Sequence, residues 1–250
     1  MRFASIFCSS LCIFLFTPSL YAQSTEPNPS SFSVSGDITL TSDYRFRGIS
    51  NSDNHPTLQG SVSLVHDSGL YAGVWASHID LGIGTSTEID YYLGYNRALN
   101  EDASLDLSYT YYDYPHAVDE AKADYGEFAA IYAHNNAFIT GDTATFSVYY
   151  SPKFTADSDQ AYYVETAYQY PLAQQFQLLT SIGYTRLTDK ENFAQGVGGD
   201  GTQQGYYDYK LGIAREFYGF GTELVWVDNN LKTDSDVAKG KTVFSISKSF

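Results

Sequence analysis

The chain has few cysteines, the residues whose disulfides commonly cross-link an exported protein. Its 250 residues include 2 cysteines, Cys8 and Cys12, and both lie in the first 22 residues. That stretch, "MRFASIFCSSLCIFLFTPSLYA", has Arg2 near its start, an apolar centre and a small residue, Ala22, at its end. This is the pattern of a cleaved signal peptide. We therefore expect a signal peptide over residues 1–22 and a mature chain without disulfides or thiol chemistry.

Basic residues and long apolar runs are also scarce. The chain has 14 Lys plus Arg against 29 Asp plus Glu, a formal net charge of −15. An acidic exported protein is not expected to bind nucleic acid. After residue 22 no run of about 18 apolar residues could form a transmembrane helix, so a membrane role would require strands. The one linker-like stretch, "QSTEPNPSS", lies in residues 23–32, a short N-terminal segment expected in the periplasm, and residues 33–250 are expected to form one domain.

What the chain has instead is alternation of apolar and polar residues. In the first such segment Ile38 and Leu40 alternate with Asp37 and Thr39. Apolar rows of period two, which indicate strands, recur in twelve segments: 34–46, 58–64, 70–76, 89–95, 105–111, 128–132, 144–150, 162–168, 176–184, 207–213, 220–226 and 242–246. The third segment is the least regular, because Tyr71 and Trp75 occupy its opposite row.

The connections between these segments alternate between long, polar, Gly-rich loops and short turns. "RGISNSDNHP" is followed by "HDSG", and "LTDKENFAQGVGGDGTQQ" by "REFYG". Short turns on one side and long loops on the other are typical of a bacterial outer-membrane barrel. We predict an all-β, transmembrane, up-and-down antiparallel barrel of about 12 strands, with 10 or 14 as alternatives. It would lie in a Gram-negative outer membrane with its long loops outside.

Charges and aromatic residues separate this barrel from a soluble β-sandwich. The apolar rows contain no charged residue, and ionisable groups such as Arg186 and Lys248 appear only where the rows reach strand ends. A Lys or Arg at mid-bilayer would cost about 2–4 kcal/mol. Aromatic residues lie at row ends, which predicts girdles at the two membrane interfaces: Tyr44, Phe46, Tyr109, Tyr111, Tyr184 and Trp226 on the loop side, Tyr95 and Tyr168 on the turn side.

The stretch "TSDYRFRGISNSDNHPTLQGSVSLVHDSGLYAGVWASHID", residues 41–80, resembles the opening of a bacterial family classed as porins, the Gcw_chp or TorF-like group. "EIDYYLGY" and "LDLSYTYYDYP" also fit the family. The resemblance implies a barrel in the outer membrane and carries no catalytic residues. The terminal Phe250 resembles the signal read by the machinery that inserts such barrels.

The rows between the apolar ones should face the lumen, and there acids outnumber bases. The acids are Asp37, Asp43, Glu88, Asp90, Asp106, Glu127, Glu165, Asp208 and Glu223, and the bases are Arg45, Arg47, Lys210 and Lys241. A negative, low-dielectric pore attracts cations. We expect a porin-like channel for passive or facilitated diffusion of small solutes, with a preference for cationic or neutral ones. The alternative is that acids and arginines pair across a filled lumen as structural ties.

Asp43, Arg45 and Arg47 are expected together at the outer end of the first strand, as a constriction or as a tether for the following loop. An enzyme is disfavoured because no serine is set apart beside a histidine. Histidine spacing does not suggest a metal site, and no cofactor is predicted. A plugged barrel acting as a lipid hydrolase, or as a surface-binding protein or adhesin, stays open. Membrane lipids and the insertion machinery are the expected partners, with solute and oligomeric state undetermined.

Overall fold

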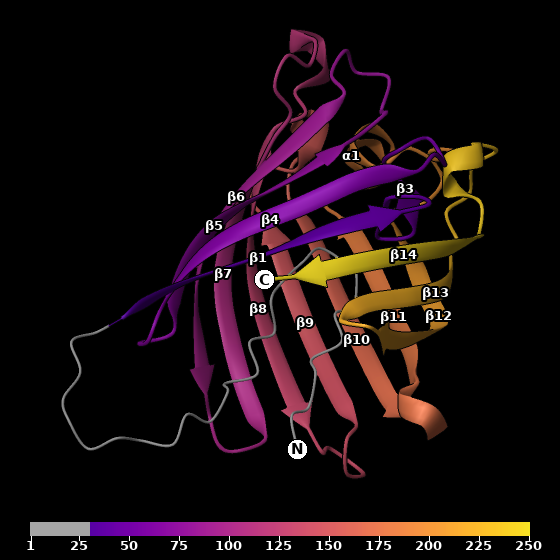
Figure 1. Ribbon diagram of the computed structural model, residues 1–250. Coiled ribbons are helices and arrows are strands. Elements are labelled where there is room, and N and C mark those ends of the chain that lie inside the picture. Colours follow the sequence, from indigo (N-terminus) through magenta and orange to yellow (C-terminus); the bar gives the residue numbers. More distant parts are fainter. Residues whose placement is uncertain (1–30) are drawn as a thin grey trace.

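The computed structural model describes residues 31–250, so the predicted signal peptide and most of the predicted N-terminal segment lie outside the described residues. Twelve antiparallel strands close into a barrel, which confirms the predicted fold class and strand number (Figure 1). They are β1 (Phe32–Thr41), β4 (Thr57–His66), β5 (Leu70–His78), β6 (Thr87–Ala98), β7 (Ala103–Asp113), β8 (Tyr125–Asn135), β9 (Thr143–Ser151), β10 (Ala161–Pro171), β11 (Gln177–Leu187), β12 (Gly205–Phe217), β13 (Phe220–Asn229) and β14 (Lys241–Ser249). The barrel begins at Phe32, one residue before the predicted start.

Alternation along each strand sorts side chains to the two faces of the barrel wall. In β1, Ile38 is 54% exposed on the outside, whereas its neighbour Asp37 is 5% exposed and faces inward. Successive side chains of a strand point to opposite faces, and a register shift by one residue would exchange the two sets. The apolar rows therefore form the outer surface, and the rows rich in Ser, Thr and carboxylates line the lumen.

The first and last strands close the barrel. β1 pairs with β14 from Asp37 opposite Ser249 to Thr41 opposite Ser245. Beyond this ladder, Phe250 and Gly36 exchange two backbone hydrogen bonds of 3.0 Å. An added Cβ on Gly36 would lie 2.7 Å from the Phe250 ring, so the glycine leaves room for the ring on the outer surface. The candidate insertion residue thus lies at the closing seam.

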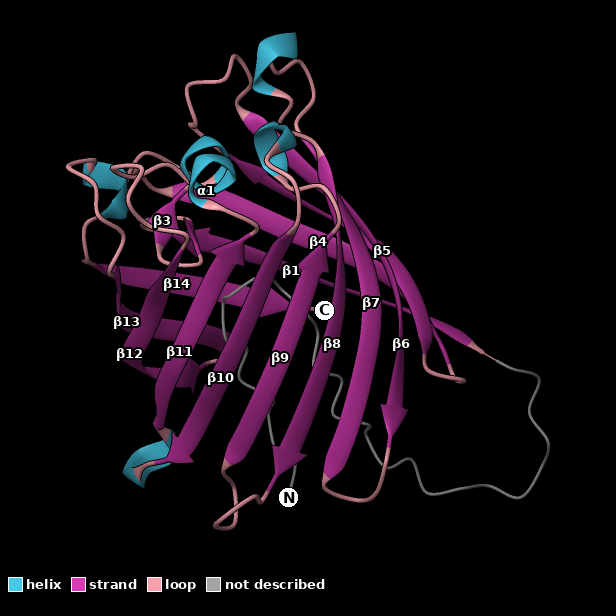
Figure 2. Ribbon diagram, turned by 180° about the vertical axis from the view of Figure 1, so that it is seen from behind, coloured by secondary structure: helices cyan, strands magenta, loops and turns pink. Residues whose placement is uncertain are grey.

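The connections confirm the predicted alternation of long loops and short turns. The loops at residues 42–56, 79–86, 114–124, 152–160, 188–204 and 230–240 form one end, here called the long-loop end. Turns at 67–69, 99–102, 136–142, 172–176 and 218–219 form the short-turn end. α1 (Lys190–Gly196) and the short 3-10 helices η1 (Asp119–Ala121), η2 (Thr155–Asp157) and η4 (Asp236–Ala238) lie at the long-loop end, and η3 (Ala173–Gln175) lies at the other (Figure 2). None of the helices in the described part of the chain is long and apolar enough to cross a membrane.

The first strand is shorter than predicted. β1 ends at Thr41, and the alternation that continues to Phe46 belongs to a separate hairpin inside the barrel. Tyr44 is buried with its ring 5.4 Å from that of Trp75, and Phe46 packs edge-on against Tyr112 at 6.2 Å. Their assignment to the outer aromatic girdle is therefore wrong. A loop hairpin has the same period of two as a barrel strand, so periodicity alone does not distinguish them.

Candidate functional site

The loop at residues 42–56 folds into the lumen as a small hairpin. Its strands are β2 (Arg45–Phe46) and β3 (Ile49–Ser50), with Phe46 paired to Ile49. The two residues between them, Arg47 and Gly48, have φ angles of 49° and 84°. Positive φ at both positions is the requirement of a type I′ turn, and glycine meets it without steric cost. The local sequence Arg-Gly therefore places the Arg47 side chain at the tip of the hairpin.

Asp43 and Arg45 hold the base of the hairpin. The buried Asp43 carboxylate accepts hydrogen bonds from Arg45 Nε at 2.6 Å, Ser50 Oγ at 2.5 Å and Ser52 Oγ at 3.1 Å. Arg45 also donates to Asn54 Oδ1 at 2.7 Å and to the carbonyls of Gly48, Val237 and Lys239 at 3.1, 3.2 and 2.9 Å. These bonds close the loop on itself and join it to the loop at 230–240. Both residues lie in the loop and not, as predicted, on the first strand.

Arg47 reaches across the lumen to the opposite wall. Its Nη2 donates to both carboxylate oxygens of Glu127 on β8, at 2.7 and 2.8 Å. In the strand order β8 lies on the far side of the ring from β1 and β4, between which the hairpin arises. The guanidinium carbon also lies 4.2 Å from the ring centroid of Tyr163, 4.6 Å from that of Phe46 and 5.4 Å from that of Tyr149. An ion pair and aromatic faces together fix the tip.

The backbone of the tip is anchored as well. Tyr206 on β12 donates its hydroxyl to the Arg47 carbonyl at 2.8 Å, and Asn229 on β13 donates to the Gly48 carbonyl at 2.9 Å. A Cβ added to Gly48 would lie 2.9 Å from the Cβ of Asp208. The hairpin therefore contacts the wall of the lumen on β8, β12 and β13.

Among the described residues, two cavities meet at the hairpin tip. The outer cavity, of about 580 Å³, lies at the long-loop end, and the inner cavity, of about 40 Å³, lies against the wall formed by β9–β13. Phe46 and Arg47 line both of them. These two side chains therefore lie between the two cavities.

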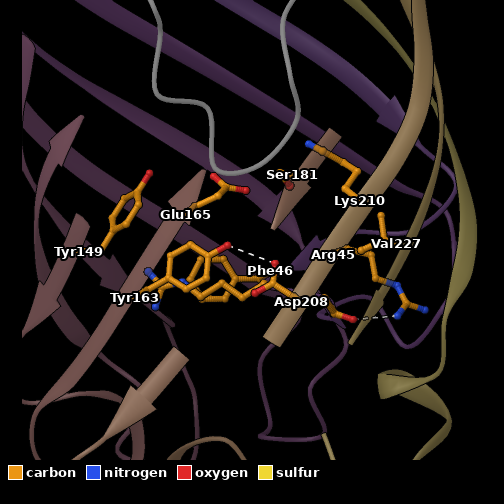
Figure 3. Close-up of a pocket in the computed structure, with 11 residues that line it drawn as sticks. Arg45, Phe46, Tyr149, Tyr163, Glu165, Ser181, Asp208, Lys210 and Val227 are labelled. Carbon is orange, nitrogen blue, oxygen red and sulfur yellow. Dashed lines mark hydrogen bonds between the residues drawn. The ribbon is translucent and has the colours of Figure 1, made fainter. Parts of the chain in front are cut away.

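The inner cavity brings together five of the predicted lumen residues, which are Arg45, Arg47, Glu165, Asp208 and Lys210. Glu165, Asp208 and Lys210 line it with Tyr163, whose hydroxyl donates to Asp208 Oδ1 at 3.1 Å. In Figure 3 the Glu165 and Lys210 head groups point to one side of the cavity, whereas Asp208 lies on the other side with Arg45. Acidic and basic groups thus alternate around the space next to the tip.

Two acids lie on the wall beside the hairpin. Glu88 accepts a hydrogen bond from Tyr114 at 3.0 Å. Asp90 stands in register between Trp75 on β5 and Tyr112 on β7, and it is 1% exposed. Among the described residues neither oxygen of Asp90 has a hydrogen-bond partner. A buried carboxylate without donors is energetically costly in its charged form.

Three more of the predicted lumen acids lie nearer the short-turn end, whereas Lys241 lies at the long-loop end of β14 and donates to the Asn54 carbonyl at 2.9 Å. Asp106 accepts from Tyr71 at 2.8 Å and from Asn96 at 3.3 Å, and Asp37 accepts from Ser61 at 2.6 Å. Glu223 is buried on the inward face of β13. All the acids predicted to face the lumen do so, but they are spread along its length and form no single cluster. No group of three or more His, Cys, Asp or Glu in the described part of the chain is placed to hold a metal ion.

Sequence reasoning did not find the aromatic residues that hold the tip. Tyr149, Tyr163 and Tyr206 are inward-facing members of rows that are otherwise polar. Trp75, noted as an irregularity of the third strand, belongs to the same class. An aromatic residue on a polar row was the available signal, since such a side chain needs another group to pack against inside the barrel.

Ion pairs link the loops that surround the outer cavity. Lys122 and Lys153 both form salt bridges to Asp157, joining the loop at 114–124 to the loop at 152–160. These hydrogen bonds, that of Lys122 first, lower the pKa of Asp157 from its ordinary value. The Ala156 amide donates to the Lys122 carbonyl at 2.8 Å. These contacts thus join two neighbouring loops at the rim of the cavity.

The chain belongs to the family described as "Bacterial protein of unknown function (Gcw_chp)", which matches residues 25–250. This confirms the membership expected from its opening residues. No curated protein matches the chain.

Among solved structures, the KdgM porin superposes with a TM-score of 0.56 and 6% identity, over 86% of this chain and 98% of that one. The NanC porin gives a TM-score of 0.54 and 5% identity, also over 86% and 98%. A structure described as the KdgM porin in complex with disordered oligogalacturonate gives 0.52 and 6%, over 89% and 98%. At these identities the likeness shows the fold alone.

Proposed function

We propose that this Gcw_chp barrel is an outer-membrane channel for small solutes and that the hairpin tip at Arg47 is its constriction. The observation that carries the proposal is that Phe46 and Arg47 line both an outer and an inner cavity within a closed barrel. The barrel architecture shared with the KdgM and NanC porins supports it. Asp43 and Arg45 then act as the tether that holds the constriction in place.

The charges of the lumen favour cationic or neutral solutes. Glu127 is neutralised by Arg47, and Asp43 by Arg45. The remaining inward acids, among them Asp37, Asp106 and Glu165, still outnumber the remaining inward bases, Lys210 and Lys241. Fixed negative charge in a narrow, low-dielectric pathway raises the local concentration of cations and repels anions. An anion would also have to pass Glu165 and Asp208 on the inner side of the tip.

The outer surface supports the proposed location. The exposed apolar rows would contact lipid. Two pairs of aromatic rings would lie at the membrane interface near the long loops. They are Tyr184 with Tyr207, with ring centroids 4.6 Å apart, and Tyr150 with Tyr162, 5.0 Å apart. With that orientation the long loops are extracellular. A cleaved signal peptide would direct export, and Phe250 would be read by the insertion machinery at the seam.

Planar-bilayer recording of the folded protein tests the channel. Discrete current steps, with a reversal potential shifted toward that of cations in a salt gradient, are the expected result. Absence of steps from folded protein would refute the channel.

The competing function is a plugged barrel that binds a partner at its surface or hydrolyses lipid, and the many anchors of the hairpin favour it. His66 Nδ1 lies 2.8 Å from Ser68 Oγ, but this is a local contact in an exposed turn. Release of fatty acid from outer-membrane lipid, lost in Ser68→Ala, would support the hydrolase.

A further inference from the structure

The outer cavity has the size and the lining of a ligand site. Its volume is about 580 Å³. Small-molecule pockets usually have volumes of about 300–1,000 Å³. Its floor is the hairpin tip, and its walls come from loops that are distant in sequence. Such pockets are mostly apolar, with a few polar groups that orient the ligand.

The walls are preformed by hydrogen bonds between loops. The Asp80 amide donates to the Asn51 carbonyl at 2.8 Å, which joins the loop at 79–86 to the hairpin loop. The Val118 amide donates to the Ile83 carbonyl at 2.9 Å, which joins the same loop to the next one. A cavity whose walls are already ordered loses little conformational entropy when a ligand binds.

The lining selects for an apolar ring. Phe46, Tyr125, Phe154 and Tyr206 contribute aromatic side chains, and Ile49 and Ile83 contribute aliphatic ones. The aromatic residues belong to the buried cluster beneath the loops, in which the rings of Tyr125 and Phe154 meet edge-on at 4.7 Å. Flat apolar faces with fixed orientation suit an aromatic solute better than an inorganic ion or a fully hydroxylated sugar.

The polar groups select against a net charge on the ligand. Arg47, whose charge is matched by Glu127, keeps Nη1 buried without a hydrogen-bond partner. Its neighbours cover Nη1, so a ligand oxygen on the floor accepts from it after a small shift of the surrounding side chains. A carboxylate would meet the nearby charge of Glu127 and the acids Asp53 and Asp80, which also line the cavity. An uncharged hydroxyl or carbonyl oxygen satisfies the donor without that repulsion.

We infer that the outer cavity binds an uncharged, ring-bearing small molecule with a hydrogen-bond-accepting oxygen, as the first binding step of permeation. The inference rests on the proposed channel for its role in transport, but binding itself does not require conduction. The ring lies among Tyr125, Phe154 and Ile83, and the oxygen accepts from Arg47. The site is closed below by the hairpin tip, so the molecule stops there before it crosses.

Fluorescence titration of 2-naphthol into the folded full-length protein in lipid nanodiscs tests the site. Saturable binding is expected, at least tenfold tighter than that of 2-naphthoate and without competition from glucose. Phe154→Ala, which removes one aromatic wall, should weaken binding at least tenfold. Phe138→Ala is the matched control, because Phe138 is 78% exposed in a turn at the opposite end of the barrel. Partitioning of the probe into lipid is common to all variants and is subtracted with empty nanodiscs.

Ile83→Trp provides a second variant that fills the cavity instead of enlarging it, and it should also abolish binding if Phe154→Ala does not fold. Equal binding of 2-naphthol to the wild type and a folded cavity variant would overturn the inference, as would tighter binding of 2-naphthoate. A barrel that conducts ions but neither binds 2-naphthol nor loses current when it is added on the loop side would refute the site and leave the channel intact. Binding without conduction would support the site and refute the channel.

Discussion

Replacing Arg47 by alanine should open the constriction. The change removes the two hydrogen bonds to Glu127 and the contacts of the guanidinium with Phe46, Tyr149 and Tyr163. It also leaves Glu127, which is 2% exposed, as a buried charge without a basic partner. Breaking a buried pair in this way costs about 3–5 kcal/mol. The cost falls on the inward position of the hairpin, because the barrel strands keep all of their ladder hydrogen bonds.

The lower end of that range, about 3 kcal/mol, corresponds to a shift of about 100-fold in the ratio of inward to displaced hairpin, since about 1.4 kcal/mol is tenfold. Even if most of the displaced hairpins still occupy part of the lumen, single-channel conductance and open probability should rise clearly. Cation preference should rise with them, because a positive charge is lost from the narrowest point.

The assay is planar-bilayer recording of the wild type, Arg47→Ala, Glu127→Ala and the double variant. The double variant removes the uncompensated charge, so its conductance should lie closer to the wild type than that of Arg47→Ala, with a coupling energy of about 0.5–3 kcal/mol in the cycle. Lys248→Ala is the control, because Lys248 is an exposed residue that contacts the carbonyl of Gly219 at the other end of the barrel. Identical conductance in the wild type and Arg47→Ala, both folded, would refute the assignment of Arg47 to the constriction.

Three further outcomes are expected. Gly48→Val should loosen the hairpin and speed hydrogen exchange of residues 43–52. A β-branched residue is strained by about 1–3 kcal/mol at this positive φ, and its Cβ would lie 2.9 Å from that of Asp208. Unchanged hydrogen exchange of residues 43–52 would argue against this. Deletion of Phe250 should reduce the yield of folded barrel in outer membranes, seen as loss of the heat-modifiable band on gels, and a normal yield would show that the residue is dispensable. The pKa of Asp157 is lowered from 3.8 by Lys122 and Lys153, so its link between loops is present above pH 3.8 and lost as the pH falls through the lowered pKa. Proteolysis of the loops should therefore be the same at pH 7 and pH 5 and become faster only when the pH falls well below 3.8 in the wild type, whereas faster cleavage already at pH 5 would contradict the lowered pKa.

The twelve strands could be predicted from sequence because their outward rows, which would face lipid, all follow one rule. A row such as Leu58, Val62 and Leu64 has to be free of charge along its whole length, and the period of two then fixes the inward row as well. The alternation of long loops and short turns indicated that consecutive strands are antiparallel neighbours in the barrel. These are local patterns, each contained within about ten residues.

The hairpin could not be predicted because its position depends on contacts distant in sequence. Arg47 and Glu127 are 80 residues apart, and Arg47 and Tyr206 are 159 apart. Nothing near Arg47 indicates whether it faces water in a loop or crosses a lumen. The Arg-Gly pair does fit a type I′ turn, but turn chemistry specifies a hairpin without placing it inside the barrel.

The outer cavity was beyond prediction for a related reason. Its walls come from segments as distant as Ile83, Phe154 and Tyr206, and each is unremarkable in its own loop or strand. The sequence named Glu127 and Asp90 alike as inward acids, and it did not distinguish Glu127, which is paired, from Asp90, which is not. Pairing inside a barrel is decided by which strands face each other across the lumen.

The most direct test of the central claim is the reversal potential of single wild-type channels in a salt gradient across a planar bilayer. The account predicts discrete steps of small conductance and a reversal potential shifted toward the equilibrium potential of the cation. A protein that is fully folded, as judged by heat-modifiable migration on gels, and yet gives no steps would contradict it. So would a reversal potential shifted toward the anion.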